Sequence, residues 1–192
     1  MKVIQFHKFK KSNEICLKNS DNFILHFVAC CSTLFHAVYK VCNVLNWALR
    51  LLVNMEKVAF SYASGLNGDF GPHSSNVTLV FHKKITDVGK AFSPITGVFT
   101  APLEGVYYFR FNLLGCSSSH RLAVCLYKNE MKILDVTKHP KGEYTYAIGG
   151  VTLLLQKGDH VYIKLREQSQ VFDNSDNHCT FSGFLLFSIH YK

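Results

Sequence analysis

The chain has 192 residues, of which 48% are hydrophobic and 18% charged, and this is too apolar for a protein that is disordered throughout. Its twelve glycines do not recur at every third position, which excludes a collagen triple helix within the chain. Sixteen Phe and nine Tyr residues favour a β-rich core over a helical bundle.

The net charge of +8 raises the question of nucleic-acid binding, and the distribution of that charge argues against it. Residues 1–56 hold seven Lys or Arg against three acids, and residues 57–192 hold 14 against ten. In the second segment the only adjacent basic pair is Lys83-Lys84, and acids interrupt the other basic residues. Phosphate-binding surfaces concentrate positive charge, because each neutralised phosphate adds to the affinity. We therefore expect no nucleic-acid partner.

Residues 1–54 differ in composition from the rest, since residues 1–21 are basic and polar and residues 23–53 are apolar. Three interpretations stay open. One is a signal peptide, or a signal-anchor that tethers the chain through residues 23–53. The second is a helical neck that joins subunits, because apolar residues recur there at alternating steps of four and three. The third is a segment foreign to the mature protein, produced by a misplaced translation start.

From residue 57 onward the hydrophobic pattern has period two, which is typical of β-strands. Residues 106–113 place four apolar side chains on one face and Arg110 on the other, and residues 121–128 and 160–165 repeat this alternation. Short turn segments separate the runs, and among them Gly158-Asp159 predicts a tight hairpin. These features predict an antiparallel sandwich or barrel.

The last predicted strand, residues 180–189, is apolar on both faces. Phe181, Leu185 and Phe187 share one face, whereas Phe184 and Leu186 share the other. In a two-layer sandwich the outer face then needs a cover, and a partner subunit is the simplest one. Gly183, in the middle of this strand, predicts a bulge or a close approach of backbone, including one to a neighbouring chain.

Two runs carry a resemblance to a known family. Residues 97–109 have the spacing Gly-x-Phe-x-Ala-Pro-x-x-Gly-x-Tyr-x-Phe, and residues 181–185 read Phe-Ser-Gly-Phe-Leu. Together with residues 58–62, 80–92, 126–130 and 157–162, in this order, they resemble the globular head of the complement C1q family, which includes the cerebellins and the adiponectin-like hormones. The likeness covers residues 57–192 and nothing before them.

The resemblance implies an all-β fold, a ten-stranded antiparallel jelly roll similar to that of tumour necrosis factor. It also implies a homotrimer, or a heterotrimer with related C1q-like chains. Phe184, Leu186 and Tyr162 are then the predicted trimer-packing residues. The implied function is non-enzymatic and extracellular: the chain would bind protein, glycan or microbial-surface ligands through end loops at residues 65–75, 138–144 and 168–177. An alternative is a cytokine-like or synapse-organising ligand for one specific receptor.

No motif of an enzyme, phosphate loop or zinc helix occurs, and His178-Cys179 is interpreted as a loop histidine beside a packed cysteine. Some relatives bind calcium, and the loop carboxylates available for it are Asp135, Glu143, Asp173 and Asp176. Thr145 stands where calcium-binding relatives carry an Asp, and a hydroxyl is a poor ligand for this hard cation, so no metal or cofactor is expected.

Three cysteines lie in the C1q-like segment, namely Cys116, Cys125 and Cys179. They allow either one disulfide and one free thiol or three buried thiols, and their number does not decide between these. Asn76-Val77-Thr78 is the only Asn-x-Ser/Thr sequence, which makes Asn76 the candidate for N-glycosylation in a secreted chain.

Overall fold

The structure is a computed structural model that describes residues 36–47 and 56–189. The chain divides into two units, Met1–Asn54 and Met55–Lys192. In the first unit, residues 36–47 form a helix whose large apolar side chains are exposed. The expectations about a leader peptide and a cleavage site concern residues that lie outside the described ones. No helix in the described ranges has both the length and the hydrophobicity that a membrane crossing requires.

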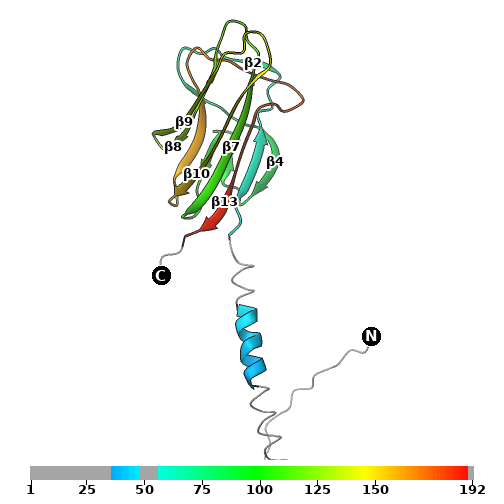
Figure 1. The fold of residues 1–192 in the computed structure, drawn as a ribbon, viewed down its shortest axis with the longest axis vertical. Helices are drawn as coiled ribbons and strands as arrows, with labels where there is room; N and C mark the ends of the chain where they lie inside the picture. The colour runs from blue at the N-terminus through cyan, green and yellow to red at the C-terminus, as the bar shows by residue number, and fades with distance from the viewer. Residues whose placement is uncertain (1–35, 48–55, 190–192) are drawn as a thin grey trace, which may run out of the picture. The chain divides into compact units, whose positions relative to one another are not determined.

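The second unit, here called the head, consists of strands in two antiparallel sheets (Figure 1). Sheet A has the order β2-β12-β7-β13-β1-β4, and β10 pairs with β7. Its strands are β1 (Ala59–Ala63), β2 (Gly68–Phe70), β4 (Lys83–Val88), β7 (Gly105–Gly115), β10 (Thr145–Leu155), β12 (Val171–Asp173) and β13 (Thr180–Ser188).

Sheet B has the order β5-β6-β11-β8-β9, and β3 pairs with β11. Its strands are β3 (Val77–Thr78), β5 (Phe92–Ser93), β6 (Val98–Thr100), β8 (Leu122–Lys128), β9 (Met131–Lys138) and β11 (His160–Leu165). The two sheets give the two-layer antiparallel jelly roll that the sequence predicted. The described chain shows thirteen strands where ten were expected, and five of them are only two or three residues long.

Aromatic rings fill the space between the sheets, as the period-two pattern predicted. Phe60 stacks on Phe92 with ring centroids 4.7 Å apart, and it meets the edge of Phe181 at 5.1 Å. Phe99 and Phe109, from opposite sheets, contact each other edge to face at 5.1 Å. Because side chains alternate along each strand, the residues between these rings point to the outer face of their sheet.

The hairpin predicted at Gly158-Asp159 is wrong, whereas the close approach predicted at Gly183 is confirmed. Gly158-Asp159 lies in the turn between β10 and β11, but these strands belong to different sheets, so the turn is not a hairpin. At Gly183 the predicted close approach is found: a Cβ at this position would lie 2.6 Å from Phe109 Cδ1 and 2.7 Å from Phe60 Cε1. The close approach that was expected there is to the head's own core.

The face predicted for Phe187 is also wrong. The pairing of β13 with β7 has a bulge between Leu185 and Phe187, and a bulge breaks the alternation of side chains. Leu185 still faces the core, but Phe187 is turned outward with Leu186 and is 52% exposed. A bulge therefore occurs in this strand, but three residues beyond Gly183.

Candidate functional site

The outer face of sheet A carries an apolar surface at the end where β13 finishes. Thr152 of β10, Tyr108 of β7, Phe184 of β13 and Ala59 of β1 lie in one row across the sheet, because each pairs with the next. The Tyr108 and Phe184 rings are in contact, with their centroids 5.6 Å apart. Five large apolar side chains around this row are between 42% and 52% exposed: Val88, Leu154, Phe184, Leu186 and Phe187. We call these five residues the apolar surface.

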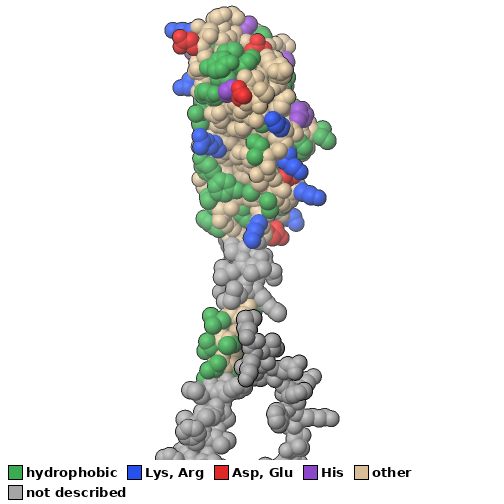
Figure 2. Space-filling view, turned by 90° about the vertical axis from the view of Figure 1, so that its right-hand side faces the viewer, with side chains coloured by type: hydrophobic (Ala, Val, Ile, Leu, Met, Phe, Trp, Pro, Cys, Tyr) green, Lys and Arg blue, Asp and Glu red, His purple; other side chains and the backbone are tan. Residues whose placement is uncertain are grey.

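The apolar surface gathers more exposed apolar side chains on one face than is usual for a monomeric protein. Its members come from three strands that are far apart in the chain, and the pairing of these strands gathers them on one side of one sheet. Figure 2, seen from the β4 side, shows hydrophobic side chains at the lower end of the head. Contiguous exposed apolar groups of this kind mark interaction surfaces.

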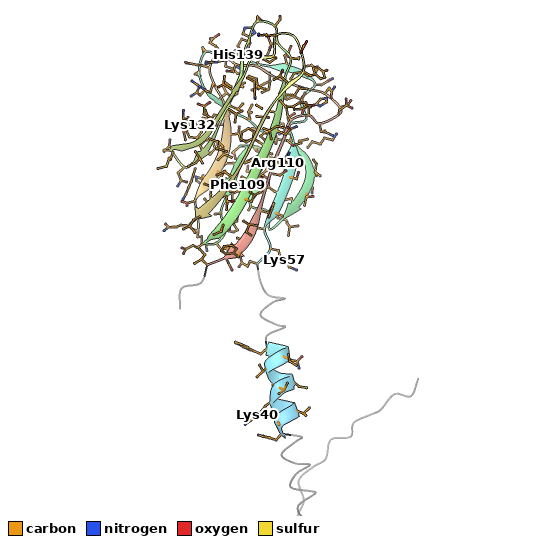
Figure 3. All side chains as sticks on the ribbon, viewed as in Figure 1. Lys40, Lys57, Phe109, Arg110, Lys132 and His139 are labelled. Carbon is orange, nitrogen blue, oxygen red and sulfur yellow. The ribbon has the colours of Figure 1, made fainter. Side chains whose placement is uncertain are left out.

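A polar row follows the apolar surface toward the middle of sheet A. It contains Gly150, Arg110, Ser182 and Ser61, which pair in this order across four strands. The two serine hydroxyls are hydrogen-bonded to each other at 2.8 Å. A Cβ at Gly150 would lie 2.6 Å from the hydroxyl oxygen of Tyr108, so this tyrosine occupies the space above the glycine. Arg110 is exposed between these neighbours (Figure 3).

Tyr162 does not join the apolar surface, although it was predicted to pack in the same interface. It lies on the outer face of sheet B, where its ring stacks on that of Tyr127 at 5.6 Å and its hydroxyl donates to the Asn129 carbonyl at 2.6 Å. The Lys164 ammonium lies 4.9 Å from the centre of the Tyr127 ring. Tyr162 therefore has partners within its own sheet, and the structure brings together only Phe184 and Leu186 of the three predicted residues.

The second candidate surface is formed by loops at the end of the head opposite to the entry of the chain. Figure 3 marks this end by His139 and the opposite end by Lys57. We call the loops at residues 64–67, 71–76, 116–121, 139–144, 166–170 and 174–179 the apical loops. Backbone hydrogen bonds join them to one another: Gly142 donates to Ser117 at 3.2 Å, and Gln168 donates to His73 at 2.9 Å.

A buried carboxylate fixes two of the apical loops. Asp173 accepts hydrogen bonds from the Ser64 hydroxyl and from the backbone N–H groups of Asn174, His178 and Cys179. The backbone distances are 2.9, 2.7 and 3.2 Å in this order. Asp173 is fully buried, and its hydrogen bonds fix the loop after β12 against the end of β1.

An aromatic cluster lies beside that loop. The rings of Tyr144 and Phe172 are 5.9 Å apart, and the Tyr146 hydroxyl lies 2.7 Å from His178 Nδ1. His178 is thus a loop residue with a hydrogen-bonding partner, next to the fully buried Cys179. Burial raises the pKa of the Cys179 thiol to about 12, which keeps it in the protonated, less nucleophilic form near neutral pH. The histidine–cysteine pair thus has the structural role that was expected of it.

The carboxylates considered for calcium do not come together. Asp135 lies on sheet B, where it pairs with Lys132 at 3.1 Å and Arg166 at 3.2 Å. Glu143 and Asp176 belong to two different apical loops, and Asp173 is enclosed as described above. The Thr145 hydroxyl donates to the Glu143 carbonyl at 3.3 Å. Over residues 36–47 and 56–189, no three His, Cys, Asp or Glu side chains are arranged to hold a metal ion.

Two further predictions concern single residues. Asn76 is exposed immediately before β3, and its side-chain oxygen accepts a hydrogen bond from the Glu167 N–H at 3.0 Å, which leaves the amide nitrogen available. All three cysteines of the head are free thiols, and Cys125 is buried as its strand position predicted. The alternative with one disulfide is therefore wrong.

The sequence pattern missed one apical loop, at residues 116–121. Its three consecutive serines between two strand-like runs were a turn signal that could have identified it. The Ser117 hydroxyl accepts from the backbone N–H groups of Ser119 and His120 at 3.3 and 3.0 Å, so it closes the loop on itself.

Comparison with known proteins identifies the head. A complement C1q subcomponent from Homo sapiens is 27% identical over 135 residues, which are 69% of this chain and 51% of that protein. Complement C1q and tumor necrosis factor-related protein 9A from Homo sapiens is 32% identical over 118 residues, which are 60% of this chain and 35% of that protein. The chain thus spans about half the length, or less, of these curated relatives.

Solved structures agree with the fold. The globular domain of the zebrafish complement 1qA protein is 25% identical and matches with a TM-score of 0.55, over 69% of this chain and 99% of that one. The Eiger TNF of S. frugiperda shares the fold with a TM-score of 0.57 at 12% identity, over 71% of this chain and 96% of that one. The family model of the C1q domain matches residues 59–186, and the chain belongs to the C1q domain family.

Proposed function

We propose that this chain is a non-enzymatic, extracellular recognition protein whose head works as a trimer and binds its ligand through the apical loops. The observation that carries the proposal is the apolar surface on sheet A, which a protein acting as a monomer would leave in water. Its relatives are named as C1q subcomponents and as a tumor necrosis factor-related protein, and these names fit a secreted recognition or signalling head.

The energetics favour association through this surface. Phe184, Leu186, Phe187 and Leu154 each keep about half of their side chain exposed. Full burial of such a side chain contributes about 1.5–3 kcal/mol, so burial of the remaining half contributes about 1 kcal/mol each, or roughly 4 kcal/mol per protomer. Tyr162 is left out of the interface, because its contacts are with sheet B.

Ligand binding is assigned to the apical loops for a geometrical reason. They lie at the end of the head opposite to Lys57, so they stay accessible when the head is attached through the end that carries Lys57 (Figure 3). The rings of Tyr144 and Phe172 and the side chains of Lys141 and His139 offer stacking and charged contacts there. Loops held by a rigid sandwich are where binding residues concentrate.

The test of the trimer is a neutral polar substitution in the apolar surface. The full chain is collected from the medium of eukaryotic cells, and its mass is measured by sedimentation equilibrium over a concentration series. Phe184→Ser with Leu186→Ser is expected to abolish a trimer that the unchanged chain forms. Ile95→Ser, at an apolar residue exposed in another part of the head, is the matched control and is expected to leave the mass unchanged. A trimer that persists in the double variant contradicts the proposed interface.

Secretion and the ligand class are tested on the same material. A shift in mass on glycosidase treatment, absent in Asn76→Gln, supports an extracellular route, whereas retention in the membrane fraction supports a tether through residues 23–53. Binding that saturates on one receptor ectodomain favours the signalling alternative. Binding that spreads over glycans and microbial surfaces favours a general recognition head. The variants Tyr144→Ala and Lys141→Ala are expected to weaken either kind of binding.

A further inference from the structure

The central strands of sheet A contain a single charged residue. Among all residues of β1, β7, β10 and β13, the only Lys, Arg, Asp or Glu is Arg110. Sheet B differs, because its outer face carries ion pairs of its own, such as Lys132 with Asp135 and Arg166 with Asp135. A single charged side chain on a face that is otherwise apolar or neutral is unusual, so the presence of Arg110 there calls for a physical explanation.

Arg110 has no partner in the described part of the chain. Its side chain makes no ion pair, hydrogen bond or ring contact there, although Ser182 and Gly150 lie directly beside it on the neighbouring strands. The Ser182 hydroxyl is engaged by Ser61, and the glycine has no side chain. The guanidinium therefore presents its five N–H donors outward, in the row next to the apolar surface.

If the outer face of sheet A is buried in an interface, the guanidinium of Arg110 needs an anion beside it. An ion that loses its water without gaining a counter-charge is strongly destabilising, and this penalty is large enough to offset the gain from burial of the apolar surface. Around a threefold axis, copies of one chain bring identical residues together near that axis. If the row that contains Arg110 faces that axis, three copies of this chain place three Arg110 side chains near one another, on a face whose central strands supply no carboxylate.

Four acids elsewhere in the head are already paired, hydrogen-bonded or buried. Asp135 and Asp159 already pair with lysine or arginine side chains, and Asp173 is fully buried. Asp87 lies on the edge strand β4, but one of its carboxylate oxygens is buried and the other accepts from the Tyr62 hydroxyl at 3.1 Å.

We propose that Arg110 selects the assembly partner: the outer face of sheet A joins a related C1q-type chain that presents a carboxylate to Arg110, in preference to further copies of this chain. The inference rests on the proposed function, since it presupposes assembly through sheet A. It makes the arginine a specificity determinant. A carboxylate on the partner chain stabilises the complex by attracting Arg110, whereas repulsion between the Arg110 side chains of identical copies disfavours the homotrimer.

The test removes or reverses the charge and measures self-association of the full chain by sedimentation equilibrium. Arg110→Ser is expected to trimerise at a concentration about tenfold or more below that of the unchanged chain. Arg110→Glu alone is expected to associate as poorly as the unchanged chain. An equimolar mixture of the two is expected to form mixed trimers more tightly than either alone, because each supplies the other's counter-charge. Lys157→Glu, an exposed lysine in the β10–β11 turn, is the control for net charge.

Each other outcome overturns the proposal. If Arg110→Ser weakens the trimer, a sister copy already supplies a carboxylate. If sulfate or phosphate tightens the trimer of the unchanged chain, an anion occupies the place of the partner. Equal association of all variants, or an absence of mixed trimers, shows that Arg110 selects nothing. Phe184→Ser with Leu186→Ser in the Arg110→Ser background separates the two proposals: only an effect of these two serines supports the interface itself.

Discussion

Gly183 gives the sharpest test of how the core is packed. In β13 a Cβ at this position would lie 2.6 Å from Phe109 Cδ1, 2.7 Å from Phe60 Cε1 and 2.8 Å from Phe109 Cε1. Ordinary contacts of a Cβ begin near 3.4 Å, so Gly183→Ala displaces two rings by most of an ångström. Neither ring moves alone, because Phe60 is stacked on Phe92 at 4.7 Å.

The expected cost of Gly183→Ala is about 2–3 kcal/mol in the free energy of unfolding, at the upper end for an overpacked core. For a head of this size, that corresponds to roughly 6–12 °C in the melting temperature. Gly150→Ala in β10 is the matched control. Its Cβ also meets an atom at 2.6 Å, but this atom is the hydroxyl oxygen of Tyr108 on the outer face, which is able to move aside. The control is expected to change stability by less than about 0.5 kcal/mol.

The measurement is urea unfolding of the full chain, followed by far-ultraviolet circular dichroism of the strands. Tryptophan fluorescence is unsuitable, because the only tryptophan is Trp47, which lies outside the head. The two variants and the unchanged chain are compared at the same protein concentration, so that assembly contributes equally. Equal stability of Gly183→Ala and Gly150→Ala would refute the claim that the core rings are immovable.

Three further predictions concern buried or bonded polar groups. The hydrogen bond from Asn129, with help from Gln156 and Lys128, lowers the pKa of Asp159, so the stabilisation by its carboxylate is present above the ordinary value near 3.8 and is lost as the pH falls below it. Asp159→Asn is expected to cost about 1–2 kcal/mol in urea unfolding at pH 7, with a difference that shrinks as the pH falls below 3.8. Asp173→Ala is expected to cost about 3–5 kcal/mol in the same assay because it leaves three backbone donors unpaired, whereas Ser64→Ala, the milder control, costs about 1–2 kcal/mol. With its pKa raised to about 12, Cys179 is expected to resist alkylation at pH 8 until the head unfolds, and equal labelling of Cys179 and half-buried Cys116, detected by peptide mass, would contradict this.

Most of the fold could be predicted from the sequence, because the period-two alternation of apolar and polar residues is visible without tertiary information. Tyr107, Phe109 and Phe111 alternate with polar residues, and all three are fully buried. Features that depend on other strands were not visible. The turn at Gly158-Asp159 resembles a hairpin turn, but only the pairing of β10 with β7 and of β11 with β8 shows that it joins two sheets.

The candidate site was predictable in part for the same reason. Phe184 and Leu186 were identified from a strand that is apolar on both faces, and this needs only the local sequence. Tyr162 was predicted together with them, but the alternation of its strand does not tell which sheet that strand joins. The apical loops are assembled by contacts such as Ser64 with Asp173, which are 109 residues apart in the chain. Such contacts leave no periodic signal in a single sequence.

The bulge in β13 shows why the apolar surface extends as far as it does. At the end of the sheet, Leu185 lies so close to Gly105 that a Cβ on the glycine would be 2.8 Å from Leu185 Cδ1. The inner side is therefore already filled, and strict alternation would direct Phe187 into occupied space. The register shift after Leu185 turns Phe187 outward beside Leu186 instead. Completion of the core thus adds a third large apolar side chain of β13 to the outer face, and the same packing that closes the head increases the surface that it offers to a partner.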